Sequence, residues 1–132
     1  SKVSKIMNNK LNNKKITFLG VTFKAGTDDM RESPSLKIIP KLIRKGCLIN
    51  YYDPTGSKKE FNKFKNIKYC TSIKDACKNT DLIIIHTEWN EFKQLNFKNI
   101  VKKKNFKIYD MRNLYSPIKM KKSKMNYFCI GR

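Results

Sequence analysis

The sequence has few acidic residues and no long apolar run. Its 132 residues include 30 lysines and arginines, only 10 aspartates and glutamates, and one histidine, His86. No apolar stretch approaches the roughly 18 residues that a membrane-spanning helix needs, and no secretory leader precedes the first predicted strand. We therefore expect a soluble, cytoplasmic single domain without a membrane partner. Because the chain opens at Ser1 rather than at a methionine, we expect a fragment or a processed chain.

Metal-ligand spacing is also absent. The four cysteines form no C-x-x-C pair, and His86 is the only possible imidazole ligand. This pattern does not predict a zinc site. A disulfide framework is not typical of a cytoplasmic domain of this size, so we expect reduced thiols. The cysteines are Cys47, Cys70, Cys77 and Cys129.

Arginine is scarce although the net charge is +20. Lysine makes up most of the basic residues, and asparagine is also abundant, as expected of a genome rich in A and T. A nucleic-acid reader would use more arginine for bidentate contacts, and would gather its basic residues on one face. The charge attracts polyanions, but we do not predict a specific nucleic-acid partner. The four arginines are Arg31, Arg44, Arg112 and Arg132.

Apolar runs alternate with helical patterns along the chain. The predicted strands are residues 15–21, 48–52, 67–69, 82–86, 106–110 and 127–130. The predicted helices are residues 1–13, 33–45, 58–64, 72–77 and part of 89–101, and Ser116-Pro117 is predicted as a turn. In the second helix Ser33 is the expected N-cap, Pro34 lies in the first turn, and Gly46 ends the helix. The alternation predicts an α/β fold: a three-layer, Rossmann-like, open and mostly parallel sheet with helices on both faces.

Ligands bind beyond the carboxyl ends of the strands in such sheets. Three predicted strand ends lead into polar loops, after Gly20, His86 and Asp110. The first loop contains Lys24 and Arg31 and precedes a helix N-terminus, a combination suited to an anion. It is neither a G-x-G-x-x-G fingerprint nor a P-loop. The residues alone leave two interpretations open: an anion site, or a loop pinned by an ion pair between Arg31 and a neighbouring aspartate (Asp28 or Asp29).

The two later loops carry further polar candidates. Arg112 either binds a ligand or caps a helix or pairs with Asp110. Glu88 either orients a ribose hydroxyl or holds a basic residue. We interpret Trp89 as a core residue rather than a stacking platform, and His86 as a structural histidine with a satisfied ring.

Four segments, in order, carry a resemblance to a known family. They are residues 23–34 (Phe-Lys-Ala-Gly-Thr-Asp-Asp-Met-Arg-Glu-Ser-Pro), 52–54 (Tyr-Asp-Pro), 87–92 (Thr-Glu-Trp-Asn-Glu-Phe) and 110–115 (Asp-Met-Arg-Asn-Leu-Tyr). They resemble the C-terminal domain of the UDP-glucose/GDP-mannose dehydrogenase family, and the last two look like its UDP-glucose branch. The similarity extends from Lys14 to the last residue, and residues 127–132 also match. Met111 stands where the family usually has glycine.

The resemblance implies a domain of a larger enzyme. Residues 14–132 would be the UDP-sugar-binding C-terminal domain, and residues 1–13 the tail of a central helical region used in homodimerisation. The family oxidises UDP-glucose to UDP-glucuronate with two NAD⁺, which an N-terminal domain holds. The catalytic cysteine of the family lies in its middle segment. None of the four cysteines of this sequence lies in a motif that resembles that segment. We therefore expect no catalytic residue in this chain, and no activity from the chain alone.

The resemblance also assigns roles to individual residues. Phe23 and Lys24 are expected to contact the UDP-sugar, and Arg112 its nucleotide portion. Arg31 is expected to reach NAD across the interdomain cleft. Two other functions remain as alternatives: a charge-driven nucleic-acid-binding module and a free-standing nucleotide-binding domain.

Overall fold

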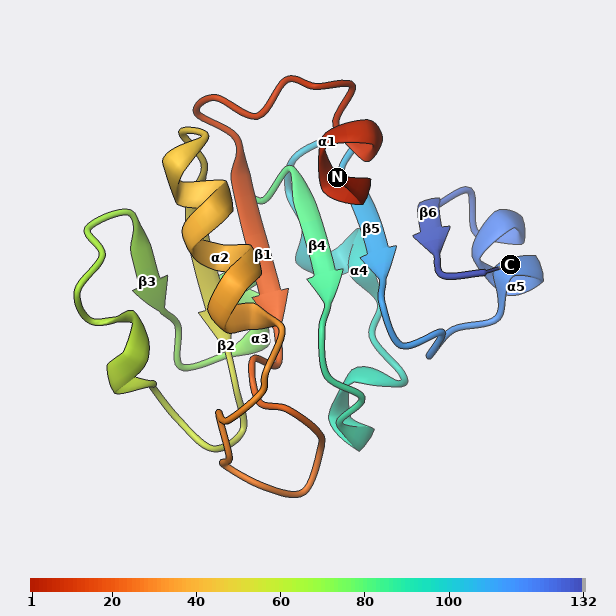
Figure 1. Ribbon diagram of the computed structural model, residues 1–132. Helices are drawn as coiled ribbons and strands as arrows, with labels where there is room; N and C mark the ends of the chain where they lie inside the picture. Colours follow the sequence, from red (N-terminus) through yellow and green to blue (C-terminus); the bar gives the residue numbers. More distant parts are fainter. Residues whose placement is uncertain (132) are drawn as a thin grey trace.

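The computed structural model describes residues 1–131, and a six-stranded sheet forms its centre (Figure 1). The strand order is β3-β2-β1-β4-β5-β6, and each neighbouring pair is parallel. The strands are β1 (Lys15–Leu19), β2 (Leu48–Tyr52), β3 (Ile67–Tyr69), β4 (Leu82–Ile85), β5 (Lys107–Asp110) and β6 (Asn126–Cys129). The predicted Rossmann-like sheet is confirmed, and it is parallel throughout.

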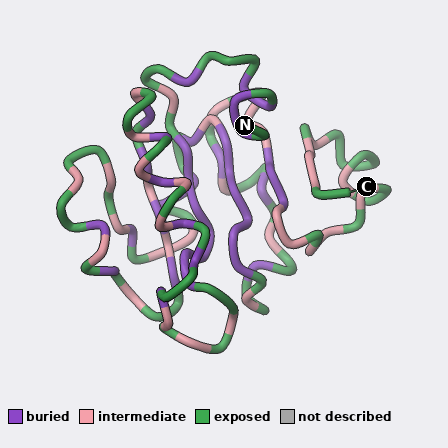
Figure 2. The backbone as a smooth tube through the Cα atoms, in the orientation of Figure 1, coloured by how far each residue is buried: buried purple, intermediate pink, exposed green. Residues whose placement is uncertain are grey.

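Helices cover both faces of the sheet and make three layers. On one face, α1 (Lys2–Ile6), α2 (Ser35–Arg44) and the short 3₁₀ helix η1 (Lys59–Phe61) contribute to one apolar cluster. On the other face, α3 (Ile73–Cys77), η2 (Asn90–Phe92), α4 (Phe97–Ile100) and α5 (Pro117–Lys122) contribute to a second. Every residue of β4 is fully buried between the two clusters (Figure 2), as its unbroken apolar run predicts.

The start of α2 differs from the prediction. The helix begins at Ser35, and no side chain caps it. The hydroxyls of Ser33 and Ser35 instead donate to the carbonyl oxygen of Val21, at 2.6 and 2.7 Å. Ser33 therefore ties the helix start to Val21, two residues beyond β1, rather than capping the helix. Gly46 follows the helix with a φ of +91°, which agrees with the predicted end.

Helix predictions at the two ends of the chain needed correction. Helix α1 spans Lys2–Ile6 only, because Asn8 and Asn9 take left-handed φ angles of 55° and 59°. The turn predicted at Ser116-Pro117 is the start of α5, where Ser116 Oγ accepts from the Lys119 amide at 3.3 Å. A serine followed by proline is typical of a helix start, so the signal was present in the sequence.

The cysteines agree with the expectation of reduced thiols. Cys47, Cys70 and Cys77 are buried, and no disulfide joins the four cysteines. Burial raises the pKa of the Cys77 thiol to about 12. Across residues 1–131, no helix has the length and hydrophobicity that a bilayer crossing requires.

Candidate functional site

The candidate site lies where the chain reverses its direction of travel across the sheet. From β1 the chain moves outward through β2 to β3, and from β4 it moves the opposite way through β5 to β6. The carboxyl ends of β1 and β4 therefore form a topological switch point, the usual ligand crevice of such sheets. The loops after β1, β4 and β5 leave this edge together, at the bottom of Figure 1. The predicted convergence of three strand ends is confirmed.

Side chains from the neighbouring strands bind the first residues of the β1–α2 loop, defined here as residues 20–34. The Val21 amide donates to Asp53 Oδ2 at 2.8 Å, from the end of β2. Thr87 Oγ1, beyond β4, donates to the Thr22 carbonyl at 3.0 Å. Asp53 and Thr87 are both buried, so water competes little for these bonds.

Arg112 extends this pattern to the next residue of the loop. Its Nη2 donates to the Phe23 carbonyl at 2.9 Å, and its Nε donates to the His86 carbonyl at 2.8 Å. These donors form one edge of the guanidinium. In the described part of the chain no hydrogen bond or ion pair involves Nη1, so the outer edge retains its donors. The alternative that the Arg112 side chain pairs with Asp110 is wrong: Arg112 binds that carboxylate through its backbone amide, at 3.1 Å, and not through its guanidinium.

Phe23 and Lys24 face solvent beside the hydrogen bonds that Arg112 makes. Phe23 is 44% exposed, which is high for a large apolar residue. Lys24 is exposed, and within residues 1–131 its ammonium has no hydrogen bond or ion pair. The loop holds their backbones in place, because the Phe23 amide donates to the Asp29 carbonyl and Thr22 Oγ1 donates to the Lys24 carbonyl, both at 3.0 Å. The structure thus brings Phe23 and Arg112 together, with Lys24 next to them.

Arg31 lies further along the same loop and has a different environment. Its Nε and Nη2 donate to the two carboxylate oxygens of Asp29 at 3.1 and 3.2 Å, and its side chain is 90% exposed. Hydrogen bonding from Arg31 lowers the pKa of Asp29. The predicted ion pair of Arg31 with a neighbouring aspartate is present, with Asp29 as the partner. No hydrogen bond or ion pair joins Arg31 to Arg112 among the described residues, and the assignment of Arg31 to NAD stays a prediction.

His86 is fully buried, and its two ring nitrogens differ in their hydrogen bonding to the described residues. Nδ1 lies 3.0 Å from Thr87 Oγ1, whereas Nε2 has no hydrogen-bond partner within residues 1–131. The prediction of a satisfied ring is therefore wrong for Nε2. Burial, together with the positive charge of Arg112, lowers the pKa of His86 to about 3, although the Gly20 carbonyl opposes the shift. The ring is neutral at physiological pH.

The remaining candidates occupy the β4–α4 loop. Glu88 is exposed, and no ion pair involves it in the described residues. Trp89 packs against the second apolar cluster, in agreement with a core position, but its Nε1 is buried without a partner among residues 1–131. Among residues 1–131, neither residue forms a hydrogen bond with Lys24 or Arg112.

Sequence reasoning missed the supporting role of Asp53, Thr87 and Gly20. Gly20 has a φ of +79°, and a Cβ there would lie 2.6 Å from the Cβ of Thr87. Glycine is therefore required both for the backbone angle and for the close approach. The sequence did contain a signal for this close approach: a glycine ends one predicted strand, and a threonine directly follows the neighbouring predicted strand.

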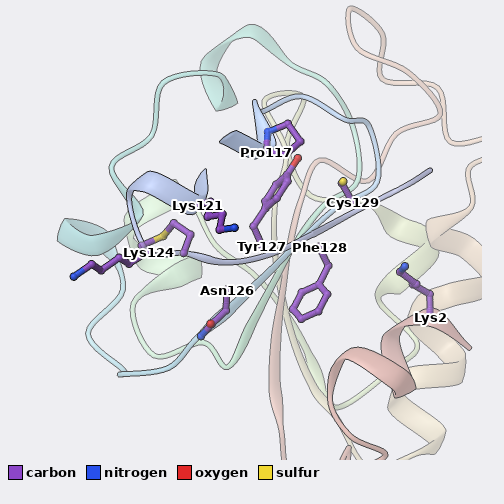
Figure 3. A pocket seen from close by; sticks show the side chains of 9 residues that line it. Lys2, Pro117, Lys121, Lys124, Asn126, Tyr127, Phe128 and Cys129 are labelled. Carbon is purple, nitrogen blue, oxygen red and sulfur yellow. The ribbon is translucent and has the colours of Figure 1, made fainter. Parts of the chain in front are cut away.

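Two cavities in the described part of the chain are not lined by the candidate residues. One of about 540 Å³ lies between α1, α2 and the end of β5, where Tyr109 and Met111 line it, and one of about 520 Å³ lies beside α5 and β6. Figure 3 shows the second, with Lys121, Lys124 and Tyr127 on one side and Lys2 of α1 on the other. Neither is lined by Phe23, Lys24, Arg31 or Arg112. Because Phe23 and Lys24 are exposed, the candidate site lies on the open surface of this edge.

Comparison with known proteins identifies the family. The UDP-binding domain of the UDP-glucose/GDP-mannose dehydrogenase family matches residues 17–117. UDP-glucose 6-dehydrogenase of Rickettsia felis is 39% identical over 133 residues, which is 98% of this chain and 30% of the relative. UDP-glucose 6-dehydrogenase of Rhizobium meliloti is 35% identical over 121 residues, which is 89% of this chain and 27% of the relative.

Solved structures show the same fold. UDP-D-ManNAc dehydrogenase from Pyrococcus horikoshii superposes with a TM-score of 0.72 at 26% identity, over 99% of this chain and 28% of the other. NDP-N-acetyl-D-galactosaminuronic acid dehydrogenase from Methanosarcina mazei gives 0.82 at 22% identity, over the same shares. The chain spans about 30% of the length of the curated relatives. It belongs to the UDP-glucose/GDP-mannose dehydrogenase family and corresponds to the UDP-binding domain of that family.

Proposed function

We propose that this chain is the UDP-sugar-binding domain of a UDP-glucose 6-dehydrogenase. One observation carries the proposal: at the switch point, Asp53, Thr87 and Arg112 bind the backbone of the loop that carries Lys24. Among residues 1–131, the Lys24 ammonium and the outer guanidinium edge of Arg112 have no hydrogen bond or ion pair. Both groups are suited to the diphosphate of a nucleotide sugar, Lys24 as a point charge and Arg112 as a planar fork. The exposed ring of Phe23 adds an apolar surface beside them.

The site fits a ligand shared with other domains. An exposed edge buries little of a nucleotide sugar on its own, so the rest of the enclosure would come from the N-terminal and central domains of the same enzyme. The proposed full-length enzyme is a homodimer that converts UDP-glucose to UDP-glucuronate with two NAD⁺. Residues 1–13 would then continue a central helical region.

The chain's own residues fit a binding role rather than a catalytic one. Burial raises the pKa of the Cys47, Cys70 and Cys77 thiols, so these cysteines are poor nucleophiles. The family depends on NAD, whose oxidised nicotinamide accepts hydride from the substrate. Arg31 fits a cofactor held by another domain: its side chain is exposed, and its bond to Asp29 leaves the outer guanidinium edge available.

Calorimetric titration of the full-length protein tests the substrate class. UDP-glucose should bind with a lower dissociation constant than GDP-mannose, and UDP alone should retain part of that affinity. In a spectrophotometric assay, the full-length protein should form two NADH per UDP-glucuronate, and the 132-residue chain alone none. GDP-mannose binding as tightly as UDP-glucose would contradict the assignment.

A further inference from the structure

We propose that Thr87 is a positioning residue that presents Lys24 to the UDP-sugar through two successive hydrogen bonds. Thr87 itself is fully buried, so it acts through the loop rather than by touching the ligand. Its Oγ1 donates to the Thr22 carbonyl at 3.0 Å, and Thr22 Oγ1 donates in turn to the Lys24 carbonyl at 3.0 Å. The identity of the ligand rests on the proposed function, whereas the bonding rests on the geometry alone.

The direction of each bond follows from counting hydrogens. A threonine hydroxyl has one hydrogen, and the Thr22 carbonyl can only accept. The Thr87 hydroxyl therefore donates its one hydrogen to the Thr22 carbonyl. It must then accept a hydrogen bond from His86 Nδ1, which lies 3.0 Å away. The His86 ring is consequently in the Nδ1–H tautomer, and its lowered pKa keeps it neutral. A buried imidazole thus fixes the orientation of the Thr87 hydroxyl.

Gly20 makes room for this arrangement. The Thr87 Cβ and Oγ1 lie where a side chain on Gly20 would start, 2.6 and 2.8 Å from an ideal Cβ. Because the residue that follows β1 has no side chain, Thr87, two residues beyond β4, reaches past it to the Thr22 peptide. The end of β4 therefore sets the path of the β1–α2 loop just before Lys24.

Thr87→Val and Thr87→Ser form a matched pair for the test. Valine keeps the shape and removes the hydroxyl, whereas serine keeps the hydroxyl and removes a methyl group. Loss of one buried hydrogen bond costs about 1.5 kcal/mol, or roughly tenfold in an equilibrium constant. In the full-length protein, Thr87→Val should speed amide hydrogen exchange of residues 22–29 and raise the UDP-glucose dissociation constant, each about tenfold. Thr87→Ser should stay within twofold of wild type, and the NAD⁺ dissociation constant should not change in either variant.

The two readouts separate this inference from the proposed function. Wild-type exchange rates in Thr87→Val would overturn the inference, as would a serine variant that is as impaired as the valine variant. If wild type does not bind UDP-glucose but Thr87→Val still loosens residues 22–29, the positioning role holds and the substrate assignment fails. Should Thr87→Val not fold, Thr22→Val removes only the second bond. It should raise the UDP-glucose dissociation constant by a similar factor, and an unchanged constant would overturn the inference.

Discussion

Arg112 Nη2 lies 2.9 Å from the carbonyl oxygen of Phe23, although 89 residues separate the two in sequence. The arginine assigned to the nucleotide therefore also holds the loop that carries the other two substrate-contact candidates. Its inner edge binds two backbone carbonyls, and its outer edge remains for a ligand. Substitution of Arg112 should disturb the site in two ways at once.

Lys24→Ala and Arg112→Ala should both weaken UDP-glucose binding. Each charge-assisted contact is worth roughly 1.5–3 kcal/mol, so each change should raise the dissociation constant about ten- to a hundredfold. Arg112→Ala should have the larger effect, because it also removes the bond to Phe23. Arg112→Lys should not restore affinity, since an ammonium lacks the planar fork. Titration calorimetry on variants shown to be folded by circular dichroism measures this; dissociation constants within twofold of wild type would place the site elsewhere.

Arg31→Ala should weaken NAD⁺ binding more than UDP-glucose binding in the full-length protein. The side chain is 90% exposed, and its only hydrogen bonds among the described residues go to Asp29, so its loss should affect a ligand held by another domain more than the loop itself. Its exposed pair with Asp29 contributes little to stability. Asp29→Asn is the matched control: it weakens the pair and keeps the Arg31 guanidinium, so NAD⁺ affinity should fall less. A selective loss of UDP-glucose affinity in Arg31→Ala would contradict the assignment.

Gly20→Ala should destabilise the fold more than Gly26→Ala. The φ angles are similar, +79° and +82°, but a Cβ on Gly20 meets Thr87 at 2.6 Å and one on Gly26 meets nothing within 4 Å. The backbone angle costs about 1–2 kcal/mol in both variants, and overpacking adds about 1–3 kcal/mol in Gly20→Ala alone. Urea unfolding of both variants measures the difference, and equal losses would show that the close approach to Thr87 is unimportant.

The fold was readable from the sequence because its signals are local. The apolar run Leu82–Ile85 marks a strand buried on both faces, and the alternation of strands and helices places its carboxyl end beside that of β1. The positions of Lys24 and Arg112 at one edge follow from that topology alone.

The hydrogen bonds that hold the site together could not be predicted from the sequence, because their acceptors are backbone carbonyls. A carbonyl has no residue type, so nothing in the sequence marks Phe23 and His86 as the acceptors of Arg112. The Asp110 alternative was reasonable by proximity, but that carboxylate accepts from the Tyr115 amide and the Tyr127 hydroxyl. The early end of α1 was hidden for a related reason, since asparagine tolerates both helical and left-handed angles.

His86 should make the domain sensitive to mild acid. Its pKa is lowered to about 3 in the folded chain, against 6.5 for an ordinary histidine. Between these values the unfolded chain binds one proton more than the folded chain, so stability is complete above pH 6.5 and falls as the pH drops toward 3. At about 1.4 kcal/mol per pH unit, the loss approaches 5 kcal/mol at the lower end. Urea unfolding at pH 7, 6, 5 and 4 measures it.

The control for this prediction is His86→Asn, which keeps a side-chain N–H for Thr87 but does not titrate. The variant should be less stable than wild type at pH 7, because asparagine fills less of the buried volume. Its disadvantage should shrink steadily as the pH falls to 4, since wild type alone loses the histidine contribution. Carboxylates titrate equally in both proteins, so the difference between them isolates His86. A difference in unfolding free energy that stays constant from pH 7 to 4 would mean that the buried ring takes up a proton as readily as an exposed one.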